Sequence, residues 1–81
     1  MATGTHANYL LDFGQLVREA AELATREARS AARGEDDFAK GRSFAYYEVI
    51  SLMQQQAVAF DLPLEDLKLE GLDPERDLLV G

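Results

Sequence analysis

Two long segments with helical periodicity are separated by only three residues, Gly34-Glu35-Asp36, and this spacing limits the folds open to the chain. Apolar residues recur every three or four positions over residues 8–33 and again over residues 37–60, which is the pattern of amphipathic helices. A connection of three residues leaves two such helices antiparallel neighbours. A chain of 81 residues builds a single core. The sequence therefore predicts an all-α fold: one domain, residues 1–81, built on an antiparallel helical hairpin.

Each predicted helix has an apolar side, and we expect the two sides to face one another. At 100° per residue, one side of the first helix collects a mixture of large and small apolar residues: Tyr9, Phe13, Leu16, Val17, Ala20, Leu23, Ala24, Ala28 and Ala31. The second helix collects mostly large ones: Phe38, Ala45, Tyr46, Val49, Leu52, Met53 and Phe60. Thr5 or Asn8 is expected to cap the first helix, and Gly41 to mark a close helix approach within the second.

Residues 61–81 form an acidic, leucine-rich tail. Pro63 precedes a short stretch, residues 64–67, that has the character of a single turn, and Asp73-Pro74 has the form of a capped helix start. Two short helical turns packed across the hairpin are therefore expected. The sequence leaves open whether this tail covers its own hairpin or that of a second chain.

A reversal near residue 35 pairs positions whose numbers add up to about 70. Glu27 then faces Arg42, which predicts a partly buried ion pair near the turn. The same pairing places Tyr9 against Phe60, Leu16 against Met53, and Gln56 opposite Gly14. We interpret the ion pair as structural; the alternative is that Arg42 binds an anion.

Two antiparallel helices alone cannot enclose a core, so something must cover the hairpin. Because most small oligomers are symmetric homodimers, the sequence favours a dimeric four-helix bundle. Aromatic and apolar residues that point away from the predicted hairpin core, or lie in the tail, are the interface candidates: Phe44, Tyr47, Val58, Leu78 and Leu79.

The net charge of −7 is concentrated in the tail, where seven acids in residues 61–81 face one lysine and one arginine. Such a field favours a basic protein partner for residues 61–81 and disfavours nucleic acid. One feature supports an RNA-binding hairpin instead, namely an arginine stripe on the first helix that Glu22 interrupts: Arg18, Arg26, Arg29 and Arg33.

The sequence shows no catalytic or metal-binding arrangement. It has no cysteine, and its single histidine, His6, has no companion ligands and no nucleophile to activate. We therefore expect no metal, no cofactor and no enzymatic activity. No apolar stretch approaches the roughly 18 residues needed to span a bilayer, so no membrane association is expected. The absence of cysteines fits a cytoplasmic location.

These observations favour a small acidic protein-interaction or regulatory protein that acts as a homodimer. The alternative is a structural or assembly subunit of a larger complex, and an RNA-binding helical hairpin dimer is less favoured. The biological process, the partner and any small-molecule ligand between the helices cannot be read from the sequence.

Overall fold

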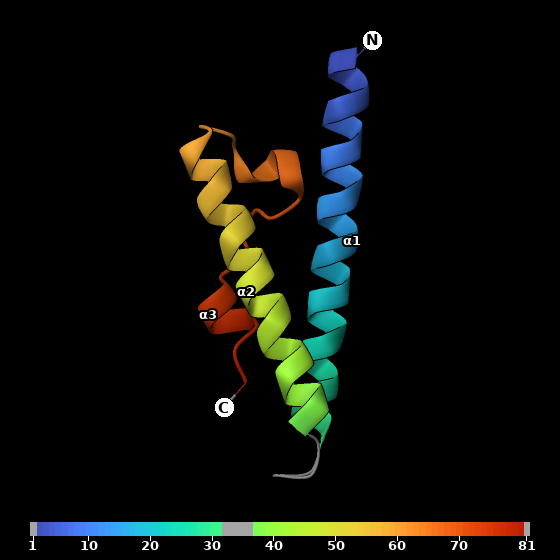
Figure 1. Cartoon of the computed structure of the whole chain (residues 1–81), viewed down its shortest axis with the longest axis vertical. Helices are drawn as coiled ribbons and strands as arrows, with labels where there is room; N and C mark the ends of the chain where they lie inside the picture. The colour runs from blue at the N-terminus through green and yellow to red at the C-terminus, as the bar shows by residue number, and fades with distance from the viewer. Residues whose placement is uncertain (1, 32–36, 81) are drawn as a thin grey trace.

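The computed structural model describes residues 2–31 and 37–80, with side chains from residue 4 onward. This described part consists of helices joined by turns and irregular segments, without a strand. Two long helices, α1 (Ala2–Ser30) and α2 (Asp37–Ala59), run antiparallel, as predicted (Figure 1). The tail adds a 3-10 turn, η1 (Leu64–Leu67), and one short helical turn, α3 (Pro74–Asp77). The molecule is elongated, with principal extents of 49 × 20 × 17 Å.

The first helix begins six residues earlier than predicted and ends three residues sooner. Thr5 and Asn8, the predicted caps, lie inside α1 because the segment before them contains no proline to prevent helix formation. Ala31 is already a bend, so the predicted extension to residue 33 is wrong at its first residue and otherwise falls outside the described residues. The predicted tight reversal, Gly34-Glu35-Asp36, falls outside them as well. The second helix matches its predicted bounds to within one residue.

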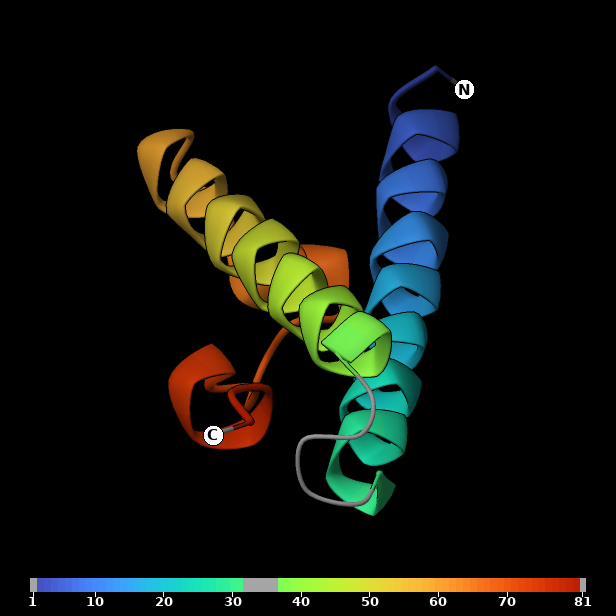
Figure 2. The ribbon, with the colours of Figure 1, turned by 60° about the horizontal axis from the view of Figure 1, so that its bottom comes forward.

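The two helices diverge away from the end where α1 finishes and α2 begins. Seen along the molecule from that end, they form a V (Figure 2). At the narrow end the packing surface is built from small residues, Ala24 and Ala28 on α1 and Ala39 and Ser43 on α2, all buried. Small side chains allow two helices to approach closely, whereas the wide end needs another segment to fill it.

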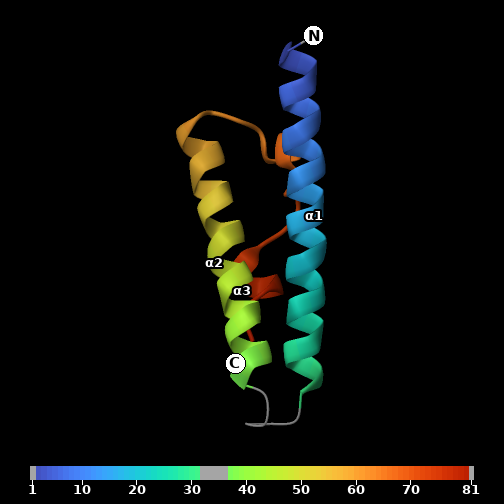
Figure 3. The ribbon, with the colours of Figure 1, turned by 45° about the vertical axis from the view of Figure 1, so that its right-hand side comes forward.

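The tail fills the wide end and covers one side of the hairpin. η1 packs against α1, and α3 packs against α2 (Figures 1 and 3). Buried tail leucines join the alanines and Ile50 of the hairpin to form the core: Leu67, Leu69, Leu72 and Leu78. The tail of this chain therefore covers its own hairpin, the point that the sequence had left open.

The close contact between η1 and α1 depends on Gly14. This residue is buried, and a Cβ atom at this position would overlap the carbonyl group of Leu67. The predicted neighbour of Gly14, Gln56, is exposed instead. Tyr9 and Phe60, predicted to pack together, are 65% and 72% exposed because η1 occupies the space between the ends of the helices. Gly41, predicted to mark close approach, has open space where a Cβ atom would lie, with no other segment within 4 Å.

Proline and capping residues define the two tail turns as the sequence predicted. Pro63 precedes η1, and Lys68, which follows η1, adopts the left-handed conformation with φ of 58°. The Asp73 carboxylate accepts hydrogen bonds from the backbone N–H groups of Glu75 and Arg76, and Pro74 occupies the first helical position of α3. These local signals specify the turns, while burial of the leucines specifies where the turns dock.

Candidate interaction surface

Each long helix exposes a second apolar stripe beside its buried side. On α1 the stripe follows a 4-3-4-3-4 spacing: Tyr9, Phe13, Leu16, Ala20, Leu23 and Glu27. On α2 the same spacing is present: Phe38, Arg42, Ala45, Val49, Leu52 and Gln56. The large apolar members of both stripes, together with Phe60 at the end of α2, are between 43% and 80% exposed. We call the two stripes with Phe60 the open face.

The open face lies on the side of the hairpin opposite the tail. Residues nine apart on a helix point in opposite directions, because nine steps of 100° leave a difference of about 180°. Arg18, which donates hydrogen bonds to tail carbonyl groups, is nine residues from Tyr9 of the open face. Gln54, which donates to the carbonyl of Leu72 at 2.9 Å, is nine residues from Ala45. Both helices therefore direct one side toward the tail and the other toward the open face.

The divergence of the helices makes the open face hollow at its wide end. A groove of about 350 Å³ lies there, bordered by Leu10 and Phe13 of α1, by Leu52 of α2 and by Phe60 just after α2. Its lining is almost wholly apolar and includes Leu67 of η1. The sequence predicted that Leu16 packs against Met53. In the structure Met53 is partly buried, whereas Leu16 is 56% exposed.

The predicted Glu27–Arg42 ion pair is present at the narrow end of the open face. The Arg42 Nη1 atom lies 2.9 Å from Glu27 Oε1, and the guanidinium also lies 5.5 Å from the centre of the Tyr46 ring. The pair is more exposed than predicted, with side-chain exposures of 36% for Arg42 and 53% for Glu27. An exposed pair of this kind contributes about 0–1 kcal/mol, so it helps to set helix register and leaves no unpaired charge on the face.

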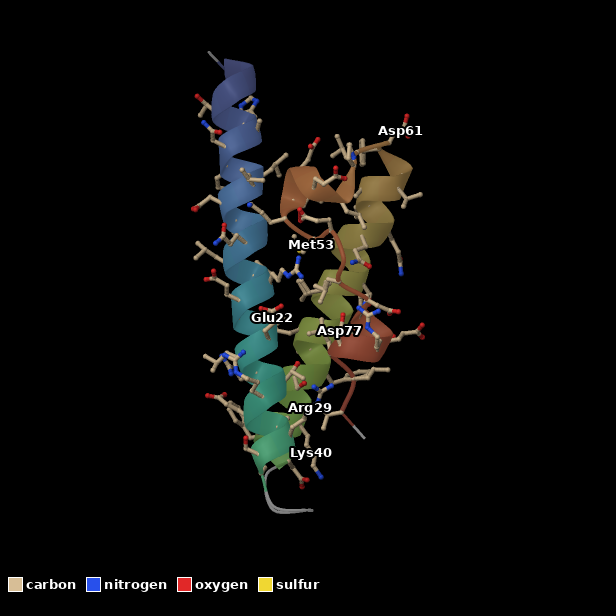
Figure 4. The ribbon with its side chains drawn as sticks, turned by 180° about the vertical axis from the view of Figure 1, so that it is seen from behind. Glu22, Arg29, Lys40, Met53, Asp61 and Asp77 are labelled. Carbon is tan, nitrogen blue, oxygen red and sulfur yellow. The ribbon has the colours of Figure 1, made fainter. Side chains whose placement is uncertain are left out.

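Arginines of α1 bind the tail on the other side of the hairpin. Arg18 Nη1 donates to the carbonyls of Lys68 and Glu70, both at 2.9 Å, and Arg18 also pairs with Glu22. Arg29 donates to the carbonyl of Asp77 at 3.4 Å; Figure 4 labels Glu22, Arg29 and Asp77 on this side. Because two members of the predicted arginine stripe hold tail carbonyls, they are less available to a phosphate backbone. Arg33, a further member, lies outside the described residues.

The interface candidates chosen from the sequence fall into two groups in the structure. Phe44, Val58 and Leu79 are exposed, and Phe44 lies against Tyr47 with ring centres 5.6 Å apart. Tyr47 is partly buried against the core. Leu78 is a correction: it is 1% exposed, because its side chain joins the core beneath the tail. Sequence reasoning pointed to the side of α2 that carries Val58, whereas the larger exposed apolar surface is the open face.

A buried polar contact links the narrow end to the end of the tail. The Thr25 hydroxyl donates to the carbonyl of Ala21 at 2.8 Å and lies 3.4 Å from the Ser43 hydroxyl. The Ser43 hydroxyl in turn donates to the carbonyl of Leu78 at 3.4 Å. Among the described residues, no buried side-chain nitrogen or oxygen atom is left without a partner. This contact stabilises the fold.

Comparison of the chain with protein-family models, with curated proteins and with solved structures finds no match. Within residues 2–31 and 37–80, no three histidine, aspartate or glutamate side chains gather as a metal site would require. None of the helices in that part of the chain combines the length and apolar character needed to cross a membrane. The open face is therefore the feature on which a functional proposal rests.

Proposed function

We propose that this chain is a protein-interaction or regulatory protein without enzymatic activity, and that it works as a homodimer joined through the open face. The observation that carries the proposal is the extent of that face. The full accessible surface of a large apolar residue is roughly 200 Å². With this value, the exposed fractions of the eight large apolar residues of the open face correspond to an accessible area of about 900 Å². A stable interface buries about 800 Å² per partner, whereas the largest apolar patch of a monomer is usually about 300–600 Å².

The spacing of the stripes supports a second copy of the chain as the partner that covers the open face. A 4-3-4-3-4 spacing is the pattern by which one helix packs along another with its axis nearly parallel or antiparallel. Two such stripes side by side form half of a four-helix bundle, and a second hairpin supplies the matching half. The proposal thus keeps the four-helix bundle expected from the sequence but assigns its interface to the open face.

The distribution of charge supports the same occupant. The open face carries only Glu27 and Arg42 as charged residues, and these already pair with one another. The part of the tail that Arg18, Arg29 and Gln54 bind, residues 68–77, lies on the opposite side of the hairpin. Two chains of net charge −7 can therefore join at the open face without bringing their acidic tails together. In the dimer both tails face outward, where they would meet a basic partner protein. The absence of cysteines fits such a role in the cytoplasm.

Sedimentation equilibrium of two matched variants tests the proposal. Val49→Glu places a charge in the open face, and Val58→Glu places the same charge at an exposed apolar position on the opposite side of α2. We expect the unmodified chain and Val58→Glu to be dimeric at micromolar concentration. Val49→Glu should weaken the dimer by at least about tenfold, because an unpaired charge would be buried. Circular dichroism would establish that both variants keep their helices.

Two outcomes would contradict the proposal. If the unmodified chain stays monomeric up to millimolar concentration, the open face does not join two copies. If Val58→Glu dissociates the dimer while Val49→Glu does not, the interface is instead the side of α2 that the sequence had suggested.

A further inference from the structure

The open face is not uniform along its length, and its two ends differ in shape. At the narrow end Phe38 projects from the first turn of α2 and is 80% exposed. At the wide end lies the apolar groove between Phe13 and Phe60. Between them the stripes contain their smallest members, Ala20 and Ala45. A projection, a flat middle and a hollow thus follow one another along the face.

We infer that the two copies of the dimer proposed above, on which this inference rests, pack with the narrow end of one on the wide end of the other. In this end-for-end packing, Phe38 of each chain occupies the groove of the other. A two-fold axis that crosses the hairpin at its middle brings the narrow end of one copy onto the wide end of its partner. In a symmetric interface each contact occurs twice, so both projections fill both hollows. A two-fold axis along the hairpin would instead set groove against groove and leave a void, which well-packed interfaces avoid.

The spacing of the α2 stripe agrees with this orientation. In an antiparallel pair of α2 helices, positions whose numbers add up to 94 face each other. Phe38 then meets Gln56 of the other copy, Arg42 meets Leu52, and Ala45 meets Val49. Each member of the stripe from 38 to 56 finds a counterpart that is itself a member of the stripe. Ala45 and Val49 lie closest to the axis, where the small side chain of Ala45 allows the helices to approach.

Charge favours the same orientation. Around the narrow end, the described residues 26–31 and 37–42 contain four basic and two acidic side chains. Next to the wide end, residues 61–70 contain four acids and one lysine. Packing end for end places the weakly basic end of one copy near the acidic end of the other and separates the two acidic ends.

Engineered cysteines test the orientation directly, because the chain has none of its own. In the double variant Phe38→Cys/Gln56→Cys the two cysteines of one chain lie about 27 Å apart along α2, at 1.5 Å per residue, so they cannot join within a chain. End-for-end packing brings each next to its counterpart in the other chain. We expect mild oxidation to convert most of the protein to a covalent dimer, seen on a non-reducing gel.

A matched control is Phe38→Cys/Val58→Cys, in which the second cysteine points to another side of α2, and it should remain largely uncross-linked. The single variant Phe38→Cys should also remain monomeric on the gel, because the two copies of Phe38 lie at opposite ends of the dimer. Cross-linking by Phe38→Cys alone, or its absence in Phe38→Cys/Gln56→Cys while sedimentation still shows a dimer, would overturn the orientation and leave the dimer standing. A monomer in sedimentation would overturn both.

Discussion

A single missing side chain, at Gly14, decides how closely the tail approaches α1. The carbonyl group of Leu67 lies where a Cβ atom of residue 14 would be, so the backbone of η1 and that of α1 are nearly in contact. Because the obstructing atoms belong to the backbone, they cannot rotate away as a flexible side chain would. Gly14 is therefore required by packing, even though glycine is a poor residue for a helix interior.

We expect Gly14→Ala to destabilise the protein by about 1–3 kcal/mol, since η1 must shift to accept the added methyl group. The matched control is Gly41→Ala in α2, where the added Cβ has open space. That variant should be more stable by up to about 1 kcal/mol, because alanine favours helix formation more than glycine does. Chemical denaturation of the two variants measures both changes. An equal gain in stability for the two would show that η1 does not lie against Gly14.

At the scale of the element, α3 is stabilised mainly by hydrogen bonds among its own polar residues. Four residues are too few to form a stable helix in isolation. Asp73 caps the turn, and Arg76 donates to the Asp77 carboxylate through Nε and Nη2, both at 2.8 Å. The backbone N–H of Asp73 donates to the same carboxylate at 2.9 Å. These contacts fix the turn that leads to Leu78, the last buried leucine.

The hydrogen bonds from Arg76 and from the Asp73 backbone lower the pKa of Asp77 from about 3.8 to about 2. A carboxyl group whose pKa is lower in the folded state stabilises that state above pH 3.8, and this contribution is lost as the pH falls through 2. We expect an NMR titration that follows the carboxyl carbon of the Asp77 side chain to show a midpoint near pH 2. In Arg76→Leu, which removes the strongest of these hydrogen-bond donors, the midpoint should rise toward 3.8. An unchanged midpoint would mean that Arg76 does not contact Asp77 in solution.

At the scale of the whole molecule, the tail is part of the core. Its four buried leucines pack on a hairpin surface lined largely by alanine and Ile50. Alanines alone bury little area, so the hairpin depends on the tail for most of the apolar contact on that side. The molecule is best described as a hairpin with one side covered by its own chain and the other side open to a partner.

A chain shortened to residues 1–61 should therefore lose its cooperative fold. Losing one buried leucine side chain usually costs about 2–5 kcal/mol, so the loss of four costs about as much as the whole stability of about 5–15 kcal/mol typical of a domain. Thermal unfolding followed by circular dichroism would show a broad, non-cooperative loss of helix in place of a sharp transition. A sharp transition retained by residues 1–61 would show that the hairpin folds without its tail.

Local patterns were enough to predict the elements of this fold. Helical periodicity located both long helices, and Pro63 together with Asp73-Pro74 located both tail turns, because capping and backbone restrictions act over a few neighbouring residues. The Glu27–Arg42 contact was also predictable, because it lies near the turn, where errors in pairing are small. These features depend on residues that are close along the chain or brought together by one reversal.

The tertiary structure alone decided which apolar side of each helix is buried. Both helices carry apolar residues over a wide arc, and periodicity cannot distinguish the part that contacts the other helix from the part that stays open. The choice follows from size: Ala24, Ala28 and Ser43 allow close packing, and the larger Phe13 and Leu52 are left on the open face. The insertion of η1 at Gly14 then separates the ends of the helices. Such contacts join residues about 50 positions apart, so their energies depend on the complete packing and cannot be read from any local pattern.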